Sequence, residues 1–516
     1  MTVVDVRDLS IAVGERDIVR SVSFTLAAGE VTALVGESGS GKTTTALALL
    51  GEHPAGARVS GRVEVAGAPV PPAPGTVGYL PQHPSAALNP VRRIGPVLHE
   101  IAHAHVRATT RRERRERTRA RVREAMRQAR LPDAERLLRR YPHQLSGGQQ
   151  QRMVLAHELA GRPRVLIADE PTTGQDGVTR GQLVAELRAV AQRGVAVLLL
   201  THDLDLVRAL ANQVLVMHSG EVLESGTCSE VLGAPRHSYT RRLVEAQPDL
   251  VVADRAADSP GRPLMSVRGL TARHGRTTTL HDISLDIHPG DRLAVLGRSG
   301  SGKTTLARCL AGLHPHGGEI RLGDQALAPG LRRRSRDQLA RVQYVFQDAR
   351  ASFNEFAPVL DQVARTAERL RGASASEARV RAADALARLG VAESSAARRP
   401  RSLSGGELQR AALVRAVLAE PDVLICDEIT SGLDAVTQAE LLDVLAKVQQ
   451  DTGCALVVIT HDLGVVAELA DRVLVLHAGR AVEQGPTARL LADPQHAVTA
   501  QLVAAAKDPA AARTDP

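Results

Sequence analysis

The chain has 516 residues, of which 43% are hydrophobic, and its 65 basic and 57 acidic side chains give a formal net charge of +8. Its length predicts two or more domains, and its four cysteines form no CxxC pair, which excludes a cysteine-based metal or disulfide framework. No run approaches the roughly 18–20 apolar residues that span a bilayer, and residues 1–10 lack the charged and apolar regions of a signal peptide, so we expect a cytosolic protein.

A glycine-rich segment, GESGSGKTT at 36–44, follows a short apolar run at 31–35 that predicts a buried strand. Glycine permits backbone turns that are closed to residues with a Cβ, so successive N–H groups can converge on phosphate oxygens. At this spacing Lys42 is expected to reach the β- and γ-phosphates of a nucleotide, and the hydroxyl of Thr43 to ligate magnesium. Residues 46–50 predict the start of a helix aimed at the phosphates.

The same series recurs in the second half, where an apolar run at 293–296 precedes the loop GRSGSGKTT at 297–305 and a predicted helix at 306–310. Two such loops predict two bound nucleotides. The loop residues predicted to bind them are Gly36, Gly39, Gly41, Lys42, Thr43 and Thr44 in the first copy, and Gly297, Gly300, Gly302, Lys303, Thr304 and Thr305 in the second.

Two further apolar runs, VLIADE at 165–170 and VLICDE at 423–428, predict strands that end in paired carboxylates. Adjacent residues of a strand point to opposite faces, so the two acids of each pair need different roles. The first acid is expected to hold magnesium, mostly through water, and the second to polarise the water that attacks the nucleotide. The expected magnesium ligands are Asp169 and Asp427, and the expected catalytic acids are Glu170 and Glu428.

Between loop and carboxylates lie LSGGQ at 145–149 and LSGGE at 403–407, each at the same distance from its magnesium aspartate. With this signature element in place, the chain resembles the ATP-binding cassette (ABC) family. The resemblance implies further site residues, namely the Q-loop residues Gln82 and Gln347, which bind nucleotide and magnesium, the D-loop residues Asp176 and Asp434, and the catalytic switch histidines His202 and His461, which sense the γ-phosphate.

Equivalent motifs of the two halves keep a nearly constant separation along the chain, which predicts duplicated domains. The resemblance implies an α/β fold class with two tandem P-loop ATP-binding cassette domains, each with a RecA-like α/β core and a helical subdomain. We expect the helical subdomains at about 97–140 and 359–398. We place the domains at 1–247 and 264–516, joined by a polar, proline-containing linker at 248–263.

In the family that the chain resembles, the signature faces away from the nucleotide of its own domain and serves a second cassette packed head to tail. The resemblance therefore implies two composite sites for ATP and Mg²⁺. Both keep every charged catalytic group, so we expect both to hydrolyse ATP. The signature residues expected to complete them are Ser404, Gly405 and Gly406 for the first loop, and Ser146, Gly147 and Gly148 for the second.

Several positions depart from the family pattern. The aromatic residue that usually stacks on adenine is replaced by Val13 and His274, the first D-loop reads TTGQDG at 172–177, and the second signature has Glu407 in place of glutamine. We therefore expect adenine recognition to be weakened or moved, and the two sites to be unequal.

Two more features resemble the peptide and nickel importers of the family. Both Q-loop glutamines open similar stretches, QHPSAALNP at 82–90 and QDARASFN at 347–354, and both halves end in similar tails, PRHSYTRRL at 235–243 and PQHAVTAQL at 494–502. The resemblance implies the ATP-hydrolysing subunit of an importer for peptides, nickel or a metal chelate. Its partners would be two integral-membrane permease subunits and an extracytoplasmic solute-binding protein, and its location the cytoplasmic face of the cell membrane.

The net charge is concentrated in one predicted helix, because Arg107–Arg130 contains 11 Arg and 3 Glu. This segment is either a solvated helix face or a contact for anionic lipid headgroups. The rival function is a soluble twin-cassette ATPase that acts on ribosomes or nucleic acid. Translation-factor members of that class carry a long charged linker, whereas the linker here is short and mildly acidic. DNA-repair members insert zinc-binding cysteines, which are absent here, so no nucleic-acid partner is expected.

Overall fold

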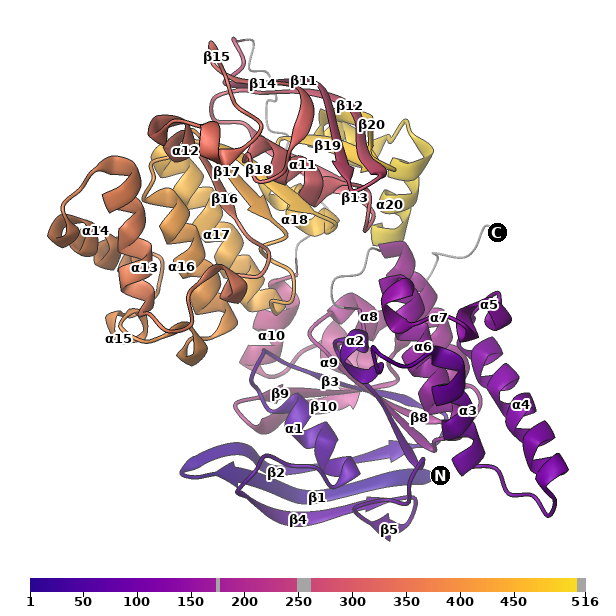
Figure 1. Cartoon of the computed structure of the whole chain (residues 1–516). Helices are drawn as coiled ribbons and strands as arrows, with labels where there is room; N and C mark the ends of the chain where they lie inside the picture. Colours follow the sequence, from indigo (N-terminus) through magenta and orange to yellow (C-terminus); the bar gives the residue numbers. More distant parts are fainter. Residues whose placement is uncertain (173–176, 248–260, 508–516) are drawn as a thin grey trace. The chain divides into compact units, whose positions relative to one another are not determined.

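The computed structural model of the chain describes residues 1–172, 177–247 and 261–507. The described residues divide into two compact units, one comprising residues 1–172 and 179–246 and the other residue 247 and residues 261–507 (Figure 1). Asp176 and most of the expected linker lie outside the described residues, so the linker boundaries stay a prediction.

The first unit is built around a six-stranded sheet in the order β10-β9-β3-β8-β7-β6, in which only the edge strand β10 is antiparallel to its neighbour. Its strands are β3 (Val31–Val35), β6 (Val77–Leu80), β7 (Val165–Asp169), β8 (Ala196–Thr201), β9 (Gln213–His218) and β10 (Glu221–Thr227). Every residue of β3, β7 and β8 is buried, as expected for inner parallel strands covered on both faces. A second, antiparallel sheet has the order β2-β1-β4-β5, formed by β1 (Thr2–Val13), β2 (Arg16–Ala27), β4 (Ala57–Val65) and β5 (Ala68–Pro69).

Helices pack around the six-stranded sheet of the first unit, and a group of them lies to one side of it (Figure 1). They are α1 (Lys42–Leu47), α2 (Pro84–Ala87), α3 (Ile94–Ala104), α4 (Arg111–Gln128), α5 (Ala134–Leu138), α6 (Gly147–Ala160), α7 (Gly177–Ala191), α8 (Leu204–Leu210), α9 (Cys228–Gly233) and α10 (Ser238–Glu245). The elements α3, α4 and α5 form the expected helical subdomain, and α4 contacts both α3 and α6.

The second unit repeats this plan, with sheet orders β16-β17-β18-β13-β19-β20 and β12-β11-β14-β15. Its strands are β11 (Met265–His274), β12 (Thr277–Ile287), β13 (Arg292–Gly297), β14 (His316–Leu322), β15 (Gln325–Ala326), β16 (Val342–Val345), β17 (Val423–Asp427), β18 (Ala455–Thr460), β19 (Arg472–His477) and β20 (Arg480–Pro486). Its helices are α11 (Lys303–Leu310), α12 (Arg336–Arg341), α13 (Val359–Thr366), α14 (Ala375–Arg388), α15 (Glu393–Ala396), α16 (Gly405–Val417), α17 (Ala435–Thr452), α18 (Leu463–Leu469), α19 (Thr487–Ala492) and α20 (Ala497–Lys507).

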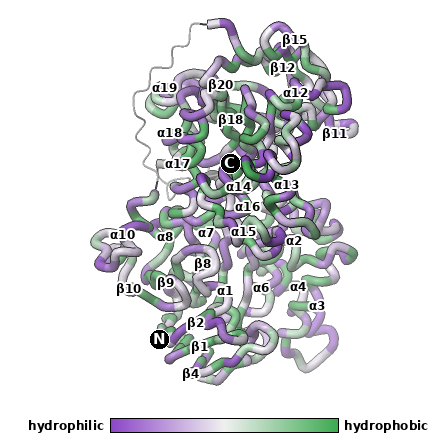
Figure 2. The backbone as a smooth tube through the Cα atoms, turned by 90° about the vertical axis from the view of Figure 1, so that its left-hand side faces the viewer, coloured by the Kyte–Doolittle hydropathy of each residue, from purple (hydrophilic) through white to green (hydrophobic). Residues whose placement is uncertain are grey.

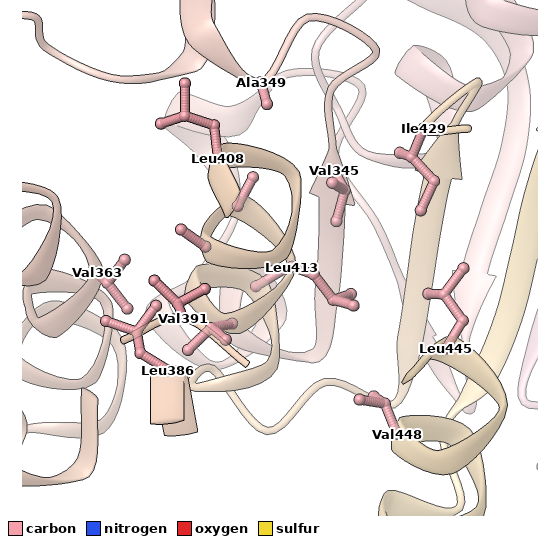
Figure 3. Close-up of a cluster of buried hydrophobic side chains, with 14 of the residues drawn as sticks. Val345, Ala349, Val363, Leu386, Val391, Leu408, Leu413, Ile429, Leu445 and Val448 are labelled. Carbon is pink, nitrogen blue, oxygen red and sulfur yellow. The ribbon is translucent and has the colours of Figure 1, made fainter. Parts of the chain in front are cut away.

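The alternation of side chains along β17 shows how the core is layered. Val423 and Ile425 belong to the hydrophobic cluster shared with the antiparallel sheet and α11, whereas Leu424 and Cys426 belong to the cluster under α13, α14, α16 and α17. Figure 3 shows part of the second cluster, with Leu413 of α16 among its labelled residues. The backbone of β18 in the same sheet is drawn in the hydrophobic colour in Figure 2. The central sheet is therefore buried between two layers, which fixes the ends of its strands in place.

The fold class predicted from the sequence is confirmed, with two α/β cassettes in tandem. Two local predictions need correction. The helices after the glycine-rich loops begin at Lys42 and Lys303, not at 46 and 306 as predicted, because the loop glycines already provide the turn into the helix. Each carboxylate strand ends at its aspartate, so Glu170 and Glu428 lie beyond the strand. Among the described helices, none is both long and apolar enough to cross a membrane.

Candidate nucleotide-binding sites

In each unit the glycine-rich loop joins the end of a central strand to the first helix. Gly41 and Gly302 cap these helices with φ values of 103° and 106°, in the left-handed region that favours glycine. A Cβ at Gly41 would lie 2.7 Å from the carbonyl oxygen of Ile18, so the loop could not approach the neighbouring strand with a larger residue. Glycine is thus required at this position both for conformation and for space.

The loop lysines are buried and fold back over their own loops. Lys42 Nζ donates to the carbonyl oxygens of Gly36 at 2.6 Å and Glu37 at 2.8 Å, and Lys303 Nζ donates to that of Gly297 at 2.8 Å. In both loops a serine hydroxyl, that of Ser40 or Ser301, is buried without a hydrogen-bond partner among the described residues. A buried ammonium and an unsatisfied hydroxyl in the same glycine-rich loop fit the binding of a polyphosphate.

In each unit, two of the three predicted magnesium ligands are adjacent. Thr43 Oγ1 donates to Asp169 Oδ2 at 3.0 Å, and Thr304 Oγ1 donates to Asp427 Oδ1 at 3.1 Å. Burial raises the pKa of both aspartates, although the hydrogen bonds that they accept oppose this. A carboxylate beside a hydroxyl supplies the oxygen ligands that Mg²⁺ prefers, so the residues fit the metal.

The structure adds a tyrosine to each pair. Tyr79 donates its hydroxyl to Asp169 Oδ2 at 2.8 Å, and Tyr344 donates its hydroxyl to Asp427 Oδ2. Sequence reasoning missed both residues. The available signal was their position, because two of only four tyrosines in the chain lie three residues before the Q-loop glutamines.

The predicted catalytic acids contact the predicted switch histidines. Glu170 Oε1 lies 2.8 Å from His202 Nδ1, and Glu428 Oε1 lies 3.5 Å from His461 Nδ1. Burial lowers the pKa of His202, but the hydrogen bond and charge of Glu170 outweigh burial and raise this pKa above its ordinary value. Burial likewise raises the pKa of Glu428, but hydrogen bonds and positive charge from His461 and Lys303 hold it below its ordinary value.

Both glutamates have a strained backbone. The φ values of Glu170 and Glu428 are 45° and 46°, in a region that non-glycine residues seldom occupy. Such strain is found preferentially at functional sites, where the surrounding structure holds the residue in place. In both copies the backbone N–H of the glutamate donates to the neighbouring strand, at the carbonyl oxygen of Leu200 or Ile459, with a length of 2.9 Å.

The Q-loop glutamines differ between the units. Gln347 Nε2 donates to Glu428 Oε2 at 3.0 Å, which brings the predicted nucleotide ligand to the catalytic acid. In the first unit, Gln82 is exposed, and no hydrogen bond between described residues joins it to Glu170. The two units therefore differ in this contact, and unequal activity of the two sites stays a prediction.

The signature serines cap helices, as the family resemblance implies. Ser146 is the N-cap of α6 and Ser404 that of α16, and each forms a capping box with the third helical residue. Gln149 Oε1 accepts from the N–H of Ser146 at 3.1 Å, and Glu407 Oε2 accepts from that of Ser404 at 2.8 Å. Glu407 therefore preserves the cap that glutamine provides in the first copy. Among described residues, neither serine side chain bonds to the glycine-rich loop of its own unit.

The two residues at the expected adenine position have different surroundings. His274 stacks on His314 with ring centroids 4.4 Å apart, and its Nε2 lies 3.5 Å from Thr305 Oγ1 in the glycine-rich loop. Val13, at the end of β1, offers no ring. Sequence reasoning did not identify His314, which follows α11 and reaches His274 only in the folded chain.

Comparison with known proteins decides the family. The family model described as "ABC transporter" matches residues 19–173 and 280–431, which together are more than half of the chain. The chain belongs to the ABC transporter family. As an ABC ATP-binding protein, it binds and hydrolyses ATP. A second family model, "Oligopeptide/dipeptide transporter, C-terminal region", matches residues 223–268 of this ABC protein and includes the tail at 235–243.

Two relatives match this ABC protein over most of its length. Glutathione import ATP-binding protein GsiA of Escherichia coli (strain K12) is 35% identical, with 94% of this chain and 86% of the relative covered. Peptidoglycan transport ATP-binding protein YejF of Agrobacterium fabrum (strain C58 / ATCC 33970) is 36% identical, with 97% and 96% covered. Among solved structures, the dimeric post-hydrolysis state of the ATP-binding cassette MJ0796 bound to ADP and Pi is 27% identical, with a TM-score of 0.39, and covers 43% of this chain and 98% of that one.

Proposed function

We propose that this ABC protein is the ATP-hydrolysing subunit of an importer for peptides or small peptide-like solutes. The observation that carries the proposal is the match of residues 223–268 to the oligopeptide/dipeptide transporter C-terminal region, which begins within the last part of the first cassette. The two relatives described above are named for glutathione import and peptidoglycan transport, which supports the same solute class. Nickel and metal chelates remain alternative solutes within the resemblance that the sequence suggested.

The proposed chemistry is the same in both units. Backbone N–H groups of the glycine-rich loop and the loop lysine bind the β- and γ-phosphates, and Mg²⁺, when bound, neutralises phosphate charge there. Thr43 with Asp169, and Thr304 with Asp427, would hold the metal. Glu170 and Glu428 accept a proton from the attacking water at a carboxylate oxygen. His202 and His461 orient these glutamates and sense the γ-phosphate.

We further propose that each site is completed by the signature of the other unit. In support, among the described residues the side chains of Ser146 and Ser404 form hydrogen bonds only with their own helix, and each stands at a helix N-terminus, which favours anions. The first site would combine Lys42 with Ser404, and the second Lys303 with Ser146. ATP binding would close the cassettes and hydrolysis would reopen them.

The proposed partners are two integral-membrane permease subunits and an extracytoplasmic solute-binding protein, with the ABC protein at the cytoplasmic face of the membrane. Its described helices provide no membrane span, so a pore has to come from other chains. The solute would contact the permeases and the binding protein, which explains why the ATP sites do not encode it.

The proposal is tested by coexpressing this chain with any permeases that neighbouring genes encode and measuring ATP hydrolysis in reconstituted vesicles. We expect the permeases to copurify and the rate to rise several-fold with a binding protein loaded with glutathione or a muropeptide. The rate with a nickel-loaded binding protein serves as the comparison. Copurification with ribosomes, together with a rate insensitive to every loaded binding protein, would favour the rival function.

A further inference from the structure

A basic groove runs between α3 and α4 in the first unit, where the two helices lie side by side (Figure 1). Its volume of about 810 Å³ is within the range of about 300–1,000 Å³ that is usual for small-molecule sites. One wall carries Arg111, Arg114, Arg115 and Arg119 of α4, and the other contains histidines of α3. The groove belongs to neither ATP site.

Several arginines of α4 outside the groove are compensated. Arg112 pairs with Glu116 at 3.2 Å, and Arg117 pairs with Glu113 at 2.6 Å. Arg121 instead donates to backbone carbonyl oxygens at the end of α6, including that of Ala160 at 3.0 Å. These residues therefore have structural roles that do not need an external anion.

The groove arginines are not compensated in this way. Among the described residues, no carboxylate forms an ion pair with any of the four. Glu100, the carboxylate on the groove wall, pairs with Arg92 at 2.7 Å. Arg111, Arg115 and Arg119 follow one another at intervals of four residues, and like charges at this spacing destabilise a helix. A bound anion would remove this repulsion.

The groove wall is held by packing. Val122, Ala125 and Met126 of α4 are buried, and α4 contacts α3 and α6. Thr118 is buried within the row of arginines and its hydroxyl donates to the carbonyl oxygen of Arg114 at 2.7 Å. The guanidinium groups therefore project from a fixed helix, so little backbone entropy is lost when they bind a ligand.

The corresponding helix of the second unit, α14, lacks such a row. Its Arg379 pairs with Asp361, and Arg381 lies 3.7 Å from Glu420. Like α4, α14 packs beside the preceding helix of the subdomain, here α13. The uncompensated row is therefore a property of the first unit and not of the cassette fold.

We propose that the α3–α4 groove binds the phosphate of anionic lipid headgroups, which rests on the proposed location of the protein at a membrane. Guanidinium groups bind phosphate through two parallel hydrogen bonds, and basic clusters are attracted to anionic lipid surfaces. A single-stranded nucleic acid is less well matched, because the groove is lined by no Phe, Tyr or Trp on which bases would stack.

The test compares the full chain with the variant Arg111→Gln/Arg114→Gln/Arg115→Gln/Arg119→Gln in flotation with vesicles of phosphatidylglycerol and phosphatidylcholine. Glutamine is a good helix former, so α4 is expected to stay folded, and unchanged ATP hydrolysis in solution checks this. The matched control, Arg332→Gln/Arg333→Gln/Arg379→Gln/Arg381→Gln, removes the same charge from exposed positions of the second unit.

A basic residue near an anionic surface contributes about fivefold in affinity, so we expect the groove variant to bind at least about tenfold more weakly while the control binds like wild type. Wild-type binding should weaken with salt and vanish on pure phosphatidylcholine. Equal losses of vesicle binding in both variants would show that only the net charge of the chain matters, and would overturn the proposal. Retained binding of the groove variant would overturn it as well. Tight binding of soluble polyphosphate or RNA without vesicle binding would contradict the lipid assignment, yet leave the importer function untouched.

Discussion

At the residue scale, Glu170 and Glu428 combine a left-handed backbone with a histidine partner. Replacing either glutamate with glutamine keeps the size of the side chain but removes the proton acceptor. We expect Glu170→Gln and Glu428→Gln each to slow turnover at its own site by about 10²–10⁴-fold, the range for general acid–base catalysis. Single-turnover ATP hydrolysis by each variant measures this, and near wild-type turnover in either one would refute the assignment for that glutamate.

The tyrosines that donate to the magnesium aspartates are positioning residues in the same sites. Without the hydroxyl, the carboxylate loses a partner that fixes its rotamer, and loss of such an outer partner typically weakens metal binding about 10–100-fold. We expect Tyr79→Phe and Tyr344→Phe to raise the Mg²⁺ concentration needed for half-maximal activity about tenfold.

Binding of Mn²⁺ in the presence of ATP, followed by electron paramagnetic resonance, gives a readout for these variants that is independent of turnover. Tyr141→Phe is the matched control, because Tyr141 stacks near His143, away from the aspartates. Unchanged Mn²⁺ affinity in both tyrosine variants would show that the hydroxyls do not position the metal ligands.

At the scale of elements, an ion pair joins the signature helix α6 to α7. Arg152 Nε lies 2.8 Å from Glu186 Oε1, and only 1% of the Glu186 side chain is exposed. Burial outweighs the arginine and raises the pKa of Glu186 to about 7, from an ordinary value of 4.5. The folded chain therefore keeps a proton that the unfolded chain releases between these values, so this carboxyl lowers stability as pH rises through that window.

We expect Glu186→Gln to remove this contribution, so that the melting temperature of the variant falls less than that of wild type between about pH 5 and about pH 8. Glu440→Gln is the control, because Glu440 lies at the α16–α17 contact of the second unit with 60% of its side chain exposed. If the melting temperatures of wild type and Glu186→Gln fall equally with pH, the ionisation of Glu186 does not destabilise the folded chain.

The elements also show how far the sequence could predict the sites. The loop lysines and the threonines, aspartates and glutamates are predicted from motifs, because each motif is local and its spacing is characteristic, whereas the switch histidines follow from the family resemblance. Tyr79 could not be assigned in this way, because it meets Asp169 only when β6 pairs with β7, which brings together segments about 90 residues apart. The contact of His274 with His314 likewise depends on tertiary structure.

At the scale of the whole molecule, the fold class and the duplication followed from the repeated motifs, whereas the inequality of the units is clearer in the structure. Gln347 contacts Glu428 although Gln82 makes no equivalent bond among described residues, and a histidine stack in the second unit replaces Val13 of the first. In contrast, Glu407 of the second unit forms the same helix cap as Gln149 of the first unit. This difference alone therefore does not make the sites unequal.

The central claim is that each ATP site uses the loop of one unit and the signature of the other. A background of Glu170→Gln/Glu428→Gln blocks hydrolysis, so the ATP retained per chain after gel filtration reports the number of intact sites. We predict that the background retains two ATP. Adding Lys42→Ala and Ser404→Arg to this background damages the same site twice, so the chain should retain one ATP. Lys42→Ala with Ser146→Arg damages both sites and should retain none. The reverse order, one ATP for the Ser146 combination and none for the Ser404 combination, would contradict the claim and show that each signature serves its own unit.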